Sequence, residues 1–139
     1  MEVNSIENGI VIDHIKAGQG LKILSHLGID TRTDTVALIM NATSSKLGRK
    51  DIIKLENLLD VDITALGLLD CGATVSYIEK GKLVRKVKLA LPDRAVDVIR
   101  CKNPRCVTSA EPGLEHVFLL VDPQTQEYRC EYCDEIVKI

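Results

Sequence analysis

Tryptophan is absent from this 139-residue sequence and phenylalanine occurs once, so any hydrophobic core must consist mainly of aliphatic side chains. No stretch approaches the roughly 20 apolar residues that a membrane-spanning helix requires. The opening residues MEVNSIENG are polar and acidic, which is not the pattern of a signal peptide. Hydrophobic residues make up 45% and charged residues 27% of the chain, which is typical of folded soluble proteins. We therefore expect a folded cytoplasmic protein that does not associate with membranes.

The sequence also lacks the motifs of an active site. No GxxxxGK[ST] loop is present, and GQG at residues 18–20 is one glycine short of a dinucleotide fingerprint. His14 and His26 have no serine or cysteine at a spacing that would suggest a nucleophile with its base. We therefore predict that the chain is not an enzyme. Any nucleotide site would have to be built from side chains on strands.

Positive charge is scarce in the last third of the chain. The net charge of the whole chain is −2, and residues 94–139 hold six Lys or Arg against eight Asp or Glu. Binding to nucleic acid without sequence specificity depends on a positive field. The composition therefore argues against nucleic acid as a partner of this segment.

The first expected element is a strand at residues 9–15, because GIVIDHI is rich in β-branched residues. Strict alternation would place His14 on the same face as Ile10 and Ile12, and Ile15 on the opposite face. A helix is expected within residues 17–29, where leucines recur at helical spacing.

The next elements give the fold class. Gly28 is placed to end the first helix, and Asp62 and Gly72 are placed to begin and end a second one. Residues 50–60 fit either a helix or a strand, and KGK at residues 80–82 signals a hairpin. Further strands are expected at residues 35–40, 74–79 and 83–91. The order β-α-β-β-α-β with an extra strand predicts an α+β domain of the ferredoxin-like type.

A second domain is expected after Pro92, so we divide the chain into residues 1–93 and 94–139. The second part contains strand candidates at residues 118–122 and 135–139. About 45 residues cannot bury enough apolar surface to be stable unaided, so a small β-rich domain with a covalent or metal staple is expected.

Four cysteines supply that staple. Cys101 and Cys106 form a C-x4-C pair, and 23 residues later Cys130 and Cys133 form a C-x2-C pair. Disulfides are disfavoured in a reducing cytosol, and a redox C-x-x-C normally opens a helix, whereas YRCEYC reads as a turn between strands. Two short loops that each supply two thiolates match a structural zinc site with no open coordination position. Four unrelated buried thiols would not explain two tight pairs.

Two other residues are assigned outside this site. His116 would be a ligand only if one cysteine were absent from the site, so we expect it at the surface. Cys71 lies outside the pattern and is expected to be an ordinary buried thiol.

Basic residues concentrate in two stretches of the first domain. Lys82, Lys86 and Lys88 would share one face of a strand, and LGRKDIIK adds further basic residues. Such clusters are typical of a solvated sheet edge that resists aggregation, but they also fit a pocket for a polyanion. A carboxylate in an otherwise apolar strand, Asp13, would suit a ribose or a lysine partner.

Several stretches resemble one known family. NGIVIDHI, LGRKDIIKLEN, NPRC and CEYC, in this order and over essentially the whole length, resemble the regulatory chain of aspartate carbamoyltransferase. The resemblance implies an N-terminal allosteric domain, a C-terminal zinc domain and no catalysis by the chain itself. It also implies regulatory dimers that join catalytic trimers, and one site for which CTP and ATP compete.

The resemblance further implies the residues of the nucleotide pocket. Asp13 and Lys54 would face the ribose and base, and Lys86 would meet the phosphates. The remaining pocket residues would be Val3, Ile6, Val11, His14, Lys50 and Ile78. The chain departs from the family at Ser76, where an amide can stand, and at Gly81, where a tyrosine can stand.

The function predicted on this basis is a nucleotide-binding regulatory subunit in pyrimidine biosynthesis that controls the catalytic chains allosterically. The alternatives are a zinc-ribbon protein that binds nucleic acid and a small metalloenzyme. The first would need a basic, aromatic-bearing ribbon, whereas the last third of the chain is acidic. The second would need an open metal position that four thiolates do not leave.

Overall fold

The computed structural model describes residues 5–139 and divides the chain into two compact units, Met1–Ala90 and Leu91–Ile139. No helix within residues 5–139 combines the length and the apolar character needed to cross a membrane.

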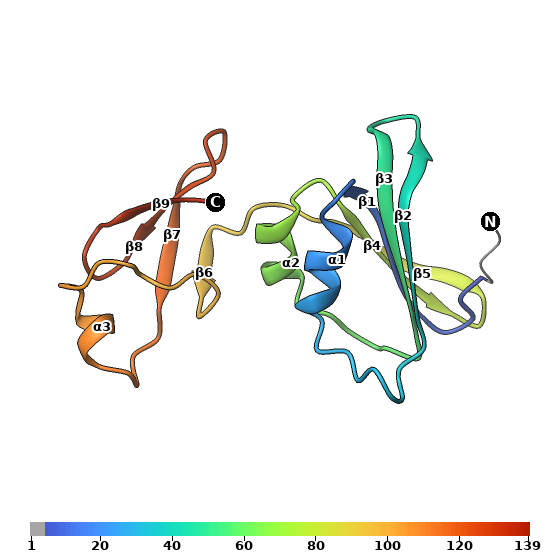
Figure 1. The fold of residues 1–139 in the computed structure, drawn as a ribbon, viewed down its shortest axis with the longest axis horizontal. Coiled ribbons are helices and arrows are strands. Elements are labelled where there is room, and N and C mark those ends of the chain that lie inside the picture. The colour runs from blue at the N-terminus through green and yellow to red at the C-terminus, as the bar shows by residue number, and fades with distance from the viewer. Residues whose placement is uncertain (1–4) are drawn as a thin grey trace. The chain divides into compact units, whose positions relative to one another are not determined.

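The N-terminal unit is an antiparallel sheet with two short helices on one face (Figure 1). Its elements are β1 (Gly9–Lys16), α1 (Gly20–Ser25), β2 (Val36–Ser44), β3 (Gly48–Glu56), α2 (Ile63–Leu69), β4 (Thr74–Glu79) and β5 (Lys82–Lys88). In the described part of the chain the five strands lie in the order β2-β3-β1-β4-β5. This is the β-α-β-β-α-β arrangement with β5 added at one edge, so the predicted α+β fold class is confirmed.

The core of this unit lies between the sheet and the helices. Ile12 and Ile53 from the sheet are fully buried, as is Ile23 from α1, and Leu66 from α2 is 2% exposed. These side chains are aliphatic, as the near absence of aromatic residues requires. The opposite face of the sheet carries the alternate residues of each strand.

A β-bulge in β1 changes which residues face the core. Pairing with β3 is regular up to Ile12 and resumes at Ile15, so Asp13 and His14 together oppose a single residue of β3. His14 takes a positive φ of 57°, and Ile15 is fully buried. The predicted alternation beyond Ile12 was therefore wrong, because the inserted residue returns Ile15 to the core face.

The helices are shorter than the predicted segments, and the ambiguous segment is a strand. β3 covers most of residues 50–60, and α1 has only six residues, with Gly28 lying beyond its end. Asp62 caps α2 as predicted, since its carboxylate accepts hydrogen bonds from two backbone amides of the first turn. Gly72 does not end α2, whose C-cap is Asp70.

The predicted hairpin between β4 and β5 is confirmed. Lys80 and Gly81 both have positive φ, 51° and 76°, which is the backbone of a two-residue type I′ turn. Just after the turn, the pairing shifts by one residue at Val84. Lys82 is therefore on the opposite face from Lys86, and the prediction that they share a face was wrong.

The C-terminal unit is a small antiparallel sheet with one helical turn. Its elements are β6 (Arg94–Val96), α3 (Val107–Ala110), β7 (Val117–Asp122), β8 (Glu127–Cys130) and β9 (Ile136–Lys138), with the sheet order β6-β7-β8-β9. The predicted strands near 118–122 and 135–139 are β7 and β9, whereas β6 and β8 were not predicted. Phe118 and Tyr128 are fully buried, and the Tyr128 hydroxyl donates to the Pro92 carbonyl over 2.6 Å. This core holds few large side chains.

Candidate metal centre and open sheet face

The two cysteine pairs converge from opposite parts of the C-terminal unit. Cys101 and Cys106 flank a loop in which the Cys106 amide donates to the Asn103 carbonyl, and Cys106 also caps α3. Cys130 ends β8, and Cys133 lies in the turn that leads to β9.

The four sulfur atoms lie within 4.8 Å of one another. The Cys101–Cys133 and Cys106–Cys130 sulfur pairs are 3.6 and 3.8 Å apart. Four thiolates bound to one zinc ion at about 2.3 Å would have sulfur–sulfur distances of roughly 3.8 Å, so the donor set fits a tetrahedral zinc ion. Three of the cysteines are buried.

His116 and Cys71 both lie outside the cluster of four sulfur atoms. His116 is not among the four clustered donors; its Nδ1 atom instead accepts a hydrogen bond from the Cys101 amide over 3.3 Å. It is half-buried rather than a surface residue. Cys71 is also half-buried and belongs to the other unit.

The thiols of this centre differ in acidity. Burial raises the pKa of Cys101 to about 12 and also raises that of Cys130. Hydrogen bonds from the Thr108 hydroxyl and backbone amide lower the pKa of Cys106 to about 7. Buried thiols hold their protons tightly, so metal binding must displace protons, and Cys106 ionises more readily than Cys101 or Cys130.

A row of four residues crosses the sheet face opposite the helices, which we call the open sheet face. Val11 on β1 pairs with Lys54 on β3 and with Ser76 on β4, and Ser76 pairs with Lys86 on β5. Directly paired residues point to the same face of a sheet. Lys54 and Lys86 therefore flank a short apolar and hydroxyl-bearing strip.

Beside this row lies an ion pair. The Lys50 ammonium is 3.0 Å from one Asp13 oxygen and 3.3 Å from the other, and the His14 amide donates to Asp13 over 2.6 Å. Burial opposes ionisation of Asp13, but the His14 amide and Lys50 outweigh it and lower the pKa of Asp13 below its ordinary value. The His14 ring contacts the Thr74 hydroxyl, at 3.0 Å, which fixes the ring beside the pair.

Two of the other predicted pocket residues, Ile6 and Ile78, lie at one end of this face, and the third, Val3, lies outside the residues that the structure describes. Ile78 pairs with Gly9, in the neighbouring row. The half-buried side chain of Ile6 comes close to Gly9, where an added Cβ atom would lie 3.1 Å from the Ile6 Cγ2 atom. Val3 lies outside the described residues. The structure thus brings together Val11, Asp13, His14, Lys50, Lys54, Ile78 and Lys86.

The pattern-based prediction missed a buried carboxylate. Asp51 is fully buried and its carboxylate accepts hydrogen bonds from three backbone amides. The available signal was its spacing, because Asp51 has the same parity on β3 as the core residues Ile53 and Leu55.

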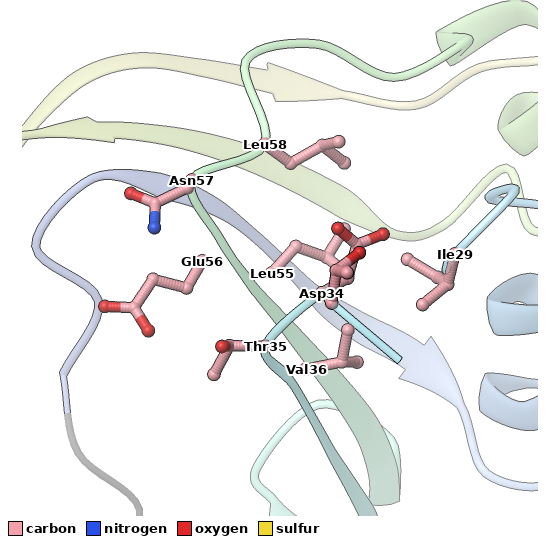
Figure 2. A pocket seen from close by; sticks show the side chains of 9 residues that line it. Ile29, Asp34, Thr35, Val36, Leu55, Glu56, Asn57 and Leu58 are labelled. Carbon is pink, nitrogen blue, oxygen red and sulfur yellow. The ribbon is translucent and has the colours of Figure 1, made fainter. Parts of the chain in front are cut away.

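The cavities of the N-terminal unit differ in size. A cavity of about 90 Å³ lies near the end of β3. Its lining includes Ile29, Val36 and Leu55 (Figure 2). It is far smaller than the roughly 300–1,000 Å³ of ligand pockets. A larger hollow of about 540 Å³ lies next to His14 and is also lined by Lys16 and Arg49. Ligand-sized space therefore lies beside the Asp13–His14 bulge.

The fold and the two sites define a two-domain class of protein, in which a ferredoxin-like sheet precedes a small domain with a four-cysteine metal centre. Residues 1–90 match the family model described as aspartate carbamoyltransferase regulatory chain, allosteric domain. Residues 93–139 match that of the metal binding domain of the same chain. The chain therefore belongs to the family of aspartate carbamoyltransferase regulatory chains, non-catalytic subunits of that enzyme.

Relatives of the same description cover nearly the whole chain. The aspartate carbamoyltransferase regulatory chain of Clostridium botulinum strain Hall is 54% identical over 136 residues, which is 98% of this chain and 93% of the relative. That of Clostridium tetani is 53% identical over 140 residues, covering 100% and 97%. That of Bifidobacterium longum is 52% identical over 139 residues and covers both chains completely.

Proposed function

We propose that this chain binds CTP and ATP on the open sheet face and transmits their binding to the catalytic chain of aspartate carbamoyltransferase. The observation that carries the proposal is the row in which Lys54 and Lys86 flank Val11 and Ser76. A ligand with a base at one end and phosphates at the other suits two cations separated by such a strip.

The charges on this face favour a phosphate at Lys86. Neither ion pair of the described residues includes Lys54 or Lys86, whereas Lys50 is already paired with Asp13. Lys86 is exposed and Lys54 is half-buried. We assign Lys86 to the phosphates, and Asp13 and Lys54 to the ribose and base.

The walls of the pocket would come from residues around this row. They are Val11, His14, Lys50 and Ile78, together with Val3 and Ile6 from the N-terminal arm. CTP and ATP would then act through unequal affinities for two quaternary states of the assembly, which shifts the equilibrium between those states.

We further propose that Cys101, Cys106, Cys130 and Cys133 hold one structural zinc ion. When bound, the ion would join the two cysteine loops and leave no open position for catalysis. The chain's own part is to hold four sulfur atoms within 4.8 Å and to shape the surface that docks on the catalytic chain. Cysteines that must stay reduced to bind a metal suit a reducing compartment, so we assign the chain to the cytoplasm.

A second copy of the chain is the other proposed partner. β2 is an edge strand, so the backbone groups on its outer side are unpaired within the sheet. Next to it lies a groove of about 590 Å³ lined by Leu21, Leu24 and Leu38. An edge strand beside an apolar groove suits a symmetric dimer. Substituting Leu21→Glu should weaken a dimer measured by sedimentation.

Calorimetry of CTP binding tests the effector site. Lys86→Ala should weaken CTP binding by about tenfold or more, because a charge-assisted contact to phosphate is lost. Lys82→Ala is the matched control, since Lys82 lies on the same strand but on the opposite face. Equal affinities of the parent and Lys86→Ala would refute the phosphate assignment.

Two further experiments test the partners. Removing the metal should abolish copurification with the catalytic chain, and association that persists in fully metal-free protein would contradict the docking role. A gel-shift with nonspecific DNA or RNA at low salt should show no binding by the intact chain. A shift there would instead favour the zinc-ribbon alternative.

A further inference from the structure

Asp51 is a fully buried carboxylate whose partners are all backbone amides. Its Oδ2 atom accepts hydrogen bonds from Gly18 over 3.1 Å and from Gly20 over 2.9 Å, and its Oδ1 atom accepts one from Asn41 over 3.0 Å. Neither ion pair within residues 5–139 includes Asp51. Burying a carboxylate costs free energy unless hydrogen bonds satisfy it, and these three backbone amides supply them. We therefore ask what the position of Asp51 does for the rest of the sheet.

The three amides belong to segments that leave the regular sheet. Asn41 lies in a bulge of β2, with φ of 60°, where Met40 and Asn41 together oppose Asp51. Gly18, with φ of 96°, lies in the turn that joins β1 to α1. A bulge frees a backbone amide from the strand ladder, and Asp51 supplies the acceptor for the amide of Asn41.

Asp51 also lies next to the bulge on the other side of β3. The Asp13–His14 bulge of β1 falls between the pairs Ile12–Ile53 and Ile15–Asp51. The bulges of β1 and β2 thus lie opposite neighbouring residues of β3. Asp51 binds the β2 bulge itself, at Asn41, and the segment that follows the β1 bulge, at Gly18 and Gly20. The space is tight, because a Cβ atom at Gly20 would lie 2.8 Å from the Asp51 carboxylate.

The residue before Asp51 is Lys50, whose side chain lies on the opposite face and pairs with Asp13 at 3.0 Å. Both members of that pair are therefore held by backbone whose path depends on Asp51. We propose that Asp51 is a positioning residue of the effector site, which fixes the β1 end and the β2 bulge so that Lys50 and Asp13 meet. This inference rests on the proposed nucleotide-binding function.

The test compares the full, metal-loaded chain with its Asp51→Asn variant. An asparagine keeps the size but replaces one acceptor oxygen with a donor that faces backbone amides. We expect faster hydrogen exchange at Gly18, Gly20 and Asn41, a higher pKa of Asp13 by NMR titration, and CTP affinity reduced about tenfold. Leu66→Ala is the control, because it removes core contacts on α2 in the same unit, and it should leave the Asp13 titration and CTP affinity unchanged.

Outcomes on two readouts decide the proposal. If Asp51→Asn folds, exchanges faster and yet matches the parent in both the Asp13 titration and CTP affinity, Asp51 is only structural and the proposal is overturned. If Asp51→Asn does not fold, Gly20→Ala replaces it, since the added methyl group displaces the carboxylate without removing its charge. That variant must then raise the pKa of Asp13.

The design separates this inference from the proposed function. If the parent itself does not bind CTP, the proposed function fails, while the titration of Asp13 still reports whether Asp51 positions the ion pair. If the parent binds CTP but Asp51→Asn changes neither the Asp13 titration nor the CTP affinity, only the role of Asp51 is refuted.

Discussion

The Thr108 hydroxyl donates a hydrogen bond to the Cys106 sulfur over 3.1 Å, and Thr108 is itself buried, with 4% of its surface exposed. Cys106 caps α3, and Thr108 lies in its first turn. The sulfur of Cys106 is thus oriented by a residue of its own helical turn. A donor of this kind stabilises a thiolate and fixes its direction, which are the contributions that outer-shell groups make to metal sites.

Replacing Thr108 should loosen the metal. Thr108→Val keeps the shape but removes the donor, so we expect zinc affinity to fall by about 10–100-fold in competition with a chromophoric chelator. Thr108→Ser restores the hydroxyl and should retain most of the affinity. A Thr108→Val protein that holds zinc as tightly as the parent would show that the hydrogen bond does not contribute.

Complete removal of the metal should unfold residues 91–139 and leave the ferredoxin-like sheet folded. The C-terminal unit has a small core, so metal binding supplies much of its folding free energy, whereas the N-terminal unit has a separate core. In two-dimensional NMR spectra, a chelator should collapse only the amide signals of the C-terminal unit. Cys130→Ser should act like the chelator, and Cys71→Ser should not. Dispersed C-terminal signals without metal would contradict this account.

The cysteine centre could be predicted from the sequence because its chemistry is local. Each short loop brings two thiols together, so only two loops have to meet, and no long-range detail is needed. Some strands could be predicted for a similar reason, since the β-branched run at residues 9–15 indicated β1 and KGK at residues 80–82 signalled the hairpin between β4 and β5.

The bulges could not be predicted, because no local residue pattern in β1 or β5 marks an inserted residue. One extra residue at Asp13–His14 turns Ile15 inward, and one at Val84 turns Lys82 away from Lys86. Around the Asp13–His14 bulge, the contacts join residues far apart in the sequence: Asp51, 38 positions beyond Asp13, accepts hydrogen bonds from backbone amides on both sides of its own strand. Face assignments based on strict alternation therefore fail beyond each bulge.

The ion pair predicts a pH dependence of stability. The pKa of Asp13 is lowered in the folded chain, so its contribution is fully present above the ordinary carboxyl pKa of about 3.9 and is lost as pH falls through the folded value. Lys50→Met should raise the pKa of Asp13 and lower stability at pH 7 by less than about 1 kcal/mol, because the pair is partly solvated.

Urea unfolding at pH 7 and at pH 2–3 measures this effect. The difference between the parent and Lys50→Met should shrink as Asp13 becomes protonated in both proteins. Lys54→Met is the control, because Lys54 belongs to neither ion pair of the described residues and should show no such convergence. A difference that stays constant across this range would assign the loss to packing by the lysine stem rather than to the ion pair.

Gly81 gives a test of backbone strain without steric interference. It has φ of 76°, and no heavy atom lies within 4 Å of the place where a Cβ atom would stand. Any loss in Gly81→Ala must therefore come from the left-handed backbone, and we expect the free energy of unfolding of the N-terminal unit to fall by about 1 kcal/mol. Gly72→Ala is the matched control, since Gly72 lacks a positive φ and its nearest contact would be an ordinary 3.5 Å. Urea unfolding followed by circular dichroism compares the two, and equal stabilities would mean that the turn relaxes out of the left-handed region at no cost. Gly81→Tyr should also lose at least as much stability as Gly81→Ala, unless the added ring finds contacts on the sheet face opposite the helices.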